Sequence, residues 1–105
     1  MTHTVELHAI WGPENTDSGV PDSYKEGGVN YPIVKVTQGY WTSFIRSYDP
    51  NKYRAAGAPV WEAWTMRNAN QRLIFQTNAT AMEMVSEGQL GRCSYLSGIG
   101  VSLRQ

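Results

Sequence analysis

The clearest pattern of hydrophobic positions lies between residues 32 and 48. Apolar side chains recur there three or four positions apart, as on one face of an α-helix: Ile33, Val36, Tyr40, Phe44 and Tyr48. Pro32 favours a first helical turn, and Asp49-Pro50-Asn51 ends the helix, because a proline disfavours helical geometry at the residue before it. Trp41 and Ile45 widen the stripe. Each ring carries about 150–250 Å² of buriable surface, so we expect this helix to lie against a larger body.

The segments on either side of this helix carry weaker patterns. Residues 3–12 could form a strand end that runs into a short helix, but their period is too brief to decide. Residues 14–31 have the composition of an exposed, mobile loop. Trp61 and Trp64, three positions apart, are spaced for one side of a short helical turn. Residues 72–77 are short, rich in strand-forming residues and bounded by Asn, and they predict a strand.

A second helix is predicted at the C-terminal end of the chain. Apolar side chains recur at helical spacing from residue 90: Leu90, Cys93, Leu96, Ile99 (or Gly100 at the same turn) and Leu103. Ser86 with Gln89 three residues later resembles a capping box. Gly91, Gly98 and Gly100 each weaken a helix by up to about 1 kcal/mol relative to Ala. We therefore expect these glycines to allow close packing against other backbone.

Length and composition exclude several classes of function. The chain has 105 residues, a formal net charge of zero and 17% charged residues, so it forms at most one domain and nothing indicates binding to nucleic acid or to an anionic membrane. No apolar run approaches the roughly 20 residues of a membrane span. The four Trp, six Tyr and two Phe exceed what these few elements can bury, which suggests a missing partner surface.

The sequence contains no complete catalytic set. It has no G-x-S-x-G, H-E-x-x-H or C-x-x-C motif and no phosphate-binding glycine loop. His3 and His8 lie five apart, which does not place two imidazoles on one helix face, so we expect neither a metal site nor a cofactor. Glu6 follows His3 by three positions and could orient its segment. From the residues alone, His3 is typical of a frayed terminus and His8 of a histidine without a special role.

Three further features have both a structural and a functional interpretation. The pairs Tyr40/Trp41 and Trp61/Trp64 could form a stacking platform for a sugar or a base, but their spacing favours a place in the core. Cys93 is the single cysteine, and a buried thiol that acts as a small hydrophobe is the commoner interpretation. Asn78-Ala79-Thr80 is a glycosylation sequon, which has meaning only in a secreted protein.

The order of these segments resembles the type B carboxylesterases, the cholinesterase/lipase group of the α/β-hydrolases. Residues 3–12 resemble the segment that carries the catalytic histidine, in which Glu follows three residues later and an aromatic-Gly pair ends the segment. Residues 40–44 with Asp49-Pro50-Asn51 resemble a late helix and its turn. Residues 61–64, the strand at 72–77 and residues 92–96 follow in the same order as in the family. The sequence of residues 39–46 is most similar to the fungal-type branch of the family.

This resemblance implies roles for several residues. His3 would match the general base of a Ser-Glu/Asp-His triad, and Glu6 a support residue near the site. Cys93 would match a half-cystine whose partner lies outside this sequence. The family would place the protein outside the cell. The sequence departs from many relatives at Thr4, where they have Gly, and across residues 14–31.

The sequence therefore predicts one partial α/β domain over residues 1–105, the C-terminal portion of an α/β-hydrolase fold, mostly helical with one or two strands. Its function would be the hydrolysis of carboxylic esters through an acyl-serine. The nucleophile belongs to an earlier part of the family's fold, so we expect this chain to need that part and to be inactive alone. The alternatives are a non-catalytic interaction module that uses the aromatic helix face, and a catalytically silent remnant.

Overall fold

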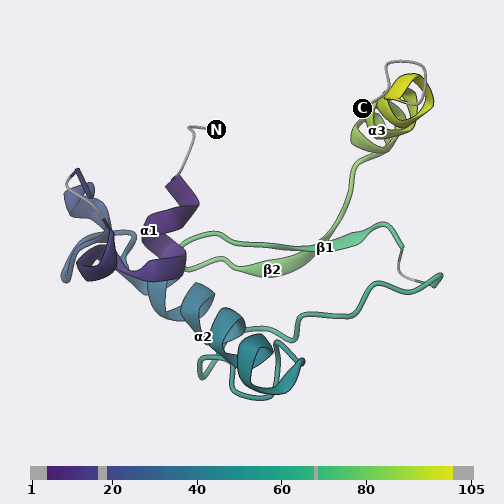
Figure 1. Ribbon diagram of the computed structural model, residues 1–105. Coiled ribbons are helices and arrows are strands. Elements are labelled where there is room, and N and C mark those ends of the chain that lie inside the picture. Colours follow the sequence, from purple (N-terminus) through teal and green to yellow (C-terminus); the bar gives the residue numbers. More distant parts are fainter. Residues whose placement is uncertain (1–4, 17–18, 68, 101–105) are drawn as a thin grey trace.

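The structure is a computed structural model that describes residues 5–16, 19–67 and 69–100. Its elements follow in the order α1 (Val5–Trp11), η1 (Pro13–Asn15), η2 (Asp22–Tyr24), α2 (Tyr31–Ser47), β1 (Gln71–Ile74), β2 (Ala81–Met84) and α3 (Glu87–Gly100). In Figure 1, α1 and α2 lie at one end of the molecule, the β1–β2 hairpin lies in the middle and α3 stands at the other end. The prediction of a mostly helical chain with one or two strands is confirmed.

The helices α1 and α2 pack against each other. Ala9 of α1 is buried, as are Ile33 and Val34 in the first turn of α2. The chain turns between α1 and η1 at Gly12, whose φ of 83° favours glycine. A Cβ atom at this position would lie 2.9 Å from the Gln38 side-chain nitrogen. Residues 5–11 are helical, so the predicted short helix is confirmed and no strand occurs within those seven residues.

The helix α2 begins and ends close to the predicted positions. Pro32 lies in its first turn, and the helix ends at Ser47. Tyr48 follows in the left-handed conformation, with φ 57°, and its backbone N–H donates to the Phe44 carbonyl at 2.7 Å. The predicted stripe is buried at Ile33 and Tyr40 but exposed at its C-terminal end, where Phe44 is 53% and Tyr48 88% exposed. That end of the stripe therefore lies outside the core.

The loop after α2 is held by side chains that bond to backbone. The fully buried Ser43 hydroxyl donates to the Asp49 carbonyl at 2.6 Å and accepts the Tyr53 N–H at 2.8 Å. Asn51 accepts the Trp61 N–H at 2.7 Å and donates to the Trp61 carbonyl at 3.0 Å. These bonds hold residues 48–61 in place, although this segment has no regular secondary structure.

The Asn51 bonds also explain why the helical turn predicted at Trp61 and Trp64 is wrong. One side chain bonds both backbone groups of Trp61, which holds this residue to the loop after α2 and competes with a helical conformation. Residues 60–65 follow an irregular path instead.

The two strands form an antiparallel hairpin in which Gln71 pairs with Met84 and Ile74 with Ala81. The predicted strand at 72–77 therefore exists but is shifted, since Phe75 leaves the ladder to join an aromatic cluster. The Arg72 guanidinium lies 2.7 Å from the Glu83 carboxylate across the two strands. The β2 strand was not predicted, because Ala-Met-Glu-Met has neither β-branched residues nor a clear alternation.

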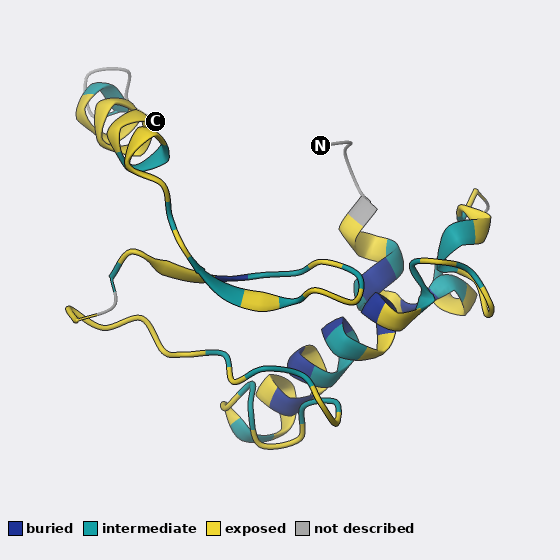
Figure 2. Cartoon of the chain, turned by 180° about the vertical axis from the view of Figure 1, so that it is seen from behind, coloured by how far each residue is buried: buried dark blue, intermediate teal, exposed yellow. Residues whose placement is uncertain are grey.

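The predicted helix at the C-terminal end is present as α3. The Gln89 N–H points to the Ser86 hydroxyl at 3.4 Å, which agrees with Ser86 as the N-cap. Figure 2 shows α3 largely exposed, and none of its described residues is buried. The predicted close packing of its glycines is wrong among the described residues: a Cβ atom at Gly91, Gly98 or Gly100 would meet nothing within 4 Å.

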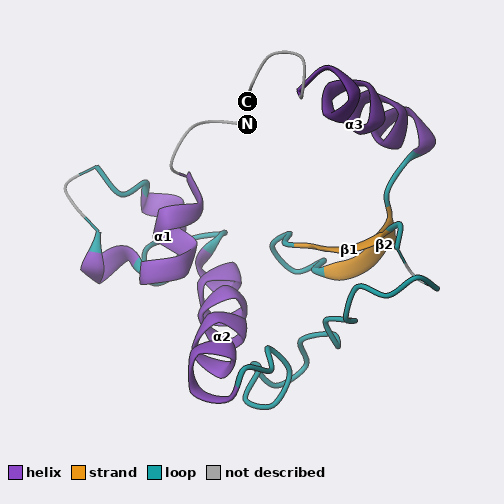
Figure 3. Cartoon of the chain, turned by 45° about the vertical axis from the view of Figure 1, so that its right-hand side comes forward, coloured by secondary structure: helices purple, strands orange, loops and turns teal. Residues whose placement is uncertain are grey.

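The chain is open for its size. Its radius of gyration is 16.3 Å, whereas a compact chain of this length has a radius of about 13 Å. Its accessible surface is 8030 Å², against about 5,900 Å² for a folded monomer of this mass. Figure 3 shows α3 standing apart from α1 and α2, in agreement with these values. No described helix combines the length and apolar character needed to cross a membrane.

Candidate functional site

The site predicted from the sequence begins at His3, which lies outside the described residues. The structure describes the segment that follows it, where α1 begins at Val5 and is held on α2 through Ala9. Glu6 lies in the first turn of α1 and is exposed to solvent. A carboxylate at this end of a helix is in the place that the helix dipole favours. The structure thus fixes the helix after His3 and leaves the Glu6 side chain accessible.

His8 has a local structural role. Its half-buried ring lies with Nδ1 3.1 Å from the Thr16 hydroxyl and with its centroid 5.8 Å from that of Tyr24. The Asn15 side chain donates to the Trp11 carbonyl at 2.9 Å, at the C-terminal end of α1. These contacts hold the turn after α1 against η2.

An aromatic cluster joins α2, the following loop and the end of β1. Tyr40 is fully buried, and its ring meets Trp61 and Phe75 edge to face at centroid distances of 5.5 and 5.7 Å. The Tyr40 hydroxyl donates to the Pro59 carbonyl. Burial raises the pKa of the Tyr40 phenol above its ordinary value, and the positive charge of Arg54 opposes this shift.

The core interpretation of the aromatic pairs is confirmed for Tyr40, which is completely buried. Trp61 is half-buried, and its ring packs against Phe75 at 5.6 Å. Trp64 is 67% exposed and bonds through its ring N–H to the Ala69 carbonyl at 2.8 Å, so a core position is wrong for this residue. No local pattern of the sequence indicated that Phe75 would complete the cluster.

Beside the cluster lies an apolar concavity, which we name the aromatic groove. It has a volume of about 550 Å³. It is lined by Tyr40 and by six further residues: Trp11, Trp41, Phe44, Ile45, Pro50 and Trp61. None of these residues carries a charge. The groove can hold an apolar group, but its lining contains no nucleophile or acid-base pair.

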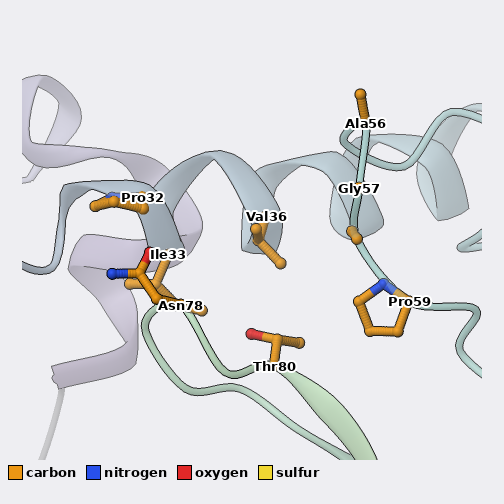
Figure 4. A pocket seen from close by; sticks show the side chains of 9 residues that line it. Pro32, Ile33, Val36, Ala56, Gly57, Pro59, Asn78 and Thr80 are labelled. Carbon is orange, nitrogen blue, oxygen red and sulfur yellow. The ribbon is translucent and has the colours of Figure 1, made fainter.

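A smaller pocket of about 250 Å³ lies between α2, residues 56–59 and the turn of the hairpin. Figure 4 shows Asn78 and Thr80 of this turn facing Ile33 and Val36 of α2. The Thr77 hydroxyl donates to the Asn30 side-chain oxygen at 2.9 Å, which ties the turn to the start of α2. Asn78 itself is exposed, with φ 59°. The glycosylation sequon therefore lies on an exposed turn.

Cys93 lies on α3, where it is exposed and not part of a disulfide. The interpretation of Cys93 as a buried hydrophobe is therefore wrong for the described chain. Within residues 5–16, 19–67 and 69–100, no three His, Cys, Asp or Glu side chains gather in a way that could hold a metal ion.

The chain is similar to the crystal structure of Aspergillus niger EstA, with 40% sequence identity and a TM-score of 0.81. It has the structure of a fragment of an esterase fold. The similarity covers 94% of this chain but 18% of EstA, so the chain spans less than a fifth of EstA's length. No protein-family model matches the chain, and no curated protein does. The predicted resemblance to an esterase is thus supported for one segment of such a fold.

Proposed function

We propose that this chain is the histidine-bearing, C-terminal segment of a type B carboxylesterase and that it acts in the hydrolysis of carboxylic esters. The observation that carries this proposal is the 40% identity to EstA over 94% of the chain. The order of the landmarks supports it: α1 begins two positions after His3, α2 ends before Asp49-Pro50-Asn51, and α3 carries Cys93.

In the proposed reaction, His3 is the general base. It takes the proton of a serine hydroxyl supplied by the rest of the fold, while the serine oxygen attacks the ester carbonyl and forms a tetrahedral intermediate. His3 then gives the proton to the alcohol oxygen as the carbon–oxygen bond to the alcohol breaks, which leaves the acyl-serine. In the second half, His3 takes a proton from water, the water oxygen attacks the acyl-serine, and the serine recovers its proton as the acid leaves. Glu6 supports the histidine segment.

A comparison of the isolated chain with a graft tests this function. The graft replaces the matching segment of EstA by this chain, and the substrate is a short-chain p-nitrophenyl ester. We expect hydrolysis by the graft and none by the isolated chain, because one imidazole without its hydroxyl cannot carry out acyl transfer. A folded but inactive graft, or an isolated chain whose hydrolysis is lost in His3→Ala, would contradict the proposal.

The same family assignment gives roles to two surface residues. Asn78 would carry an N-linked glycan in a secreted protein, and Cys93 would pair with a cysteine outside this sequence. Both side chains are exposed, as these reactions require. Expression in a secreting fungal host followed by intact-mass measurement tests Asn78, because Asn78→Gln should remove the added glycan mass.

A second candidate function is a non-catalytic interaction module. The open aromatic groove favours it, since large exposed apolar surfaces mark interaction sites. In that case the chain would bind a partner other than the rest of an esterase fold, and the EstA graft would gain no activity from it.

A further inference from the structure

The aromatic groove is an apolar feature of the described surface that the proposed chemistry does not use. Its exposed members belong to one continuous face of α1 and α2: Trp11 is 58%, Phe44 53% and Ile45 71% exposed. Removing these apolar side chains from water would be favourable. Such a face is too apolar to be a solvated surface.

The charges around the groove indicate the chemistry of its occupant. The lining is uncharged, and the two cations of α2 are engaged elsewhere. Lys35 lies over the Tyr31 ring at 5.4 Å, and Arg46 lies over the Tyr53 ring at 4.5 Å. A charged occupant would lose its hydration without gaining a partner. The groove therefore suits an apolar surface and excludes an acidic or basic peptide.

The exposed area indicates the size of that occupant. The chain exposes about 2,100 Å² more than a folded monomer of its mass. A standard interface buries about 800 Å² on each partner, and obligate interfaces bury more. The excess thus matches an obligate interface with a macromolecule.

We propose that the aromatic groove docks on the remaining part of an ester-hydrolase fold and that Phe44 and Ile45 are the central contacts of this interface. The inference rests on the proposed function, which names the fold. It adds that the apolar stripe of α2 is buried on its own loop at Tyr40 but is exposed at Phe44 and Ile45, where the larger body would cover it. The 18% of EstA that this chain spans leaves a body large enough to cover the groove.

Co-expression tests this docking without using catalysis as the readout. The full 105-residue chain is produced with an EstA polypeptide that lacks the matching segment, and the complex is isolated through a tag on the EstA piece. Phe44→Glu and Ile45→Glu should each weaken the complex by about 30-fold or more, as for central interface residues. The matched control is Val29→Glu, because Val29 is 75% exposed but does not line the groove. Circular dichroism confirms that each variant keeps its helices.

The outcomes separate this inference from the proposed function. A complex that forms with the His3→Ala chain and is lost in Ile45→Glu supports the docking even if no ester is hydrolysed. An active complex in which both glutamate variants bind like Val29→Glu would overturn the docking and leave the function standing. Failure to form any complex, or a homodimer of the chain that Ile45→Glu dissolves, would also overturn it.

Discussion

The Tyr40 ring meets the Trp61 ring edge to face at a centroid distance of 5.5 Å and an interplanar angle of 85°. Tyr40 belongs to α2 and Trp61 to an irregular segment twenty-one positions later, so this contact closes the loop between them. The Tyr40 hydroxyl adds a hydrogen bond to the Pro59 carbonyl. One buried residue therefore joins a helix to a loop that has no secondary structure of its own.

Two substitutions of Tyr40 should distinguish the contribution of its ring to stability from that of its hydroxyl. Tyr40→Phe keeps the ring contacts but leaves the Pro59 carbonyl without its donor, so it should lower the free energy of unfolding by about 1 kcal/mol. Tyr40→Ala also removes the ring and should cost about 3–5 kcal/mol. Urea unfolding followed by tryptophan fluorescence measures both changes. Equal losses in the two variants would mean that the ring packing contributes nothing.

The raised pKa of Tyr40 predicts a loss of stability at alkaline pH. The folded chain holds the phenolic proton more tightly than the unfolded chain, where the pKa is near 10.0. The contribution of Tyr40 to the free energy of unfolding is therefore fully present below pH 10. It should fall as the pH rises through the pKa of the unfolded state towards the raised pKa of the folded state. Unfolding free energies measured between pH 8 and pH 11, relative to Tyr40→Phe, should show this fall. A difference between the two proteins that does not change with pH would contradict it.

Asn51 should contribute measurably to the free energy of unfolding. Asn51→Ala leaves both backbone groups of Trp61 without their partner, which should cost about 1–3 kcal/mol. Thr42→Ala is the matched control, because its exposed hydroxyl bonds only within α2, to the Gln38 and Gly39 carbonyls. That change should stay within about 0.5 kcal/mol. Thermal unfolding of the two variants compares them directly, and similar costs would argue against an anchoring role for Asn51.

Two glycines should respond in opposite ways to alanine. Gly12→Ala places a Cβ 2.9 Å from Gln38 at a φ of 83°, so it should destabilise the α1–α2 packing by about 1–2 kcal/mol. Gly91→Ala meets no atom within 4 Å in α3 and should strengthen that helix by up to about 1 kcal/mol. Circular dichroism during urea unfolding distinguishes the two effects. Stabilisation by Gly12→Ala would show that this turn does not need glycine.

The helices could be predicted from the sequence because each has a local signal. The apolar spacing from Ile33 to Tyr40 and the proline at each end locate α2, and Ser86 locates the start of α3. The hairpin and the loop could not be predicted in the same way. Trp61 is held by Asn51 through bonds that no local pattern reports, and Phe75 leaves its strand to meet a ring thirty-five positions earlier.

The candidate site was predictable only in part. The excess of aromatic residues indicated a missing partner surface, and the exposed Trp11 and Phe44 agree with that expectation. The aromatic groove itself was not predictable, because its walls come from α1, α2 and two points of the following loop. The role of His3 came from a resemblance, and it stays a prediction because this residue lies outside the described part of the chain.

The most direct measurement is the kcat/KM of the EstA graft for a short-chain p-nitrophenyl ester, with His3→Ala compared with His8→Ala. His3→Ala should lower this value by about 1,000-fold or more, because the general base acts as a unit with the serine. His8→Ala serves as the control, since its ring contacts Thr16 and Tyr24 within the first turns of the chain, and it should retain the hydrolysis rate. Hydrolysis that survives His3→Ala undiminished would contradict the assignment of the general base.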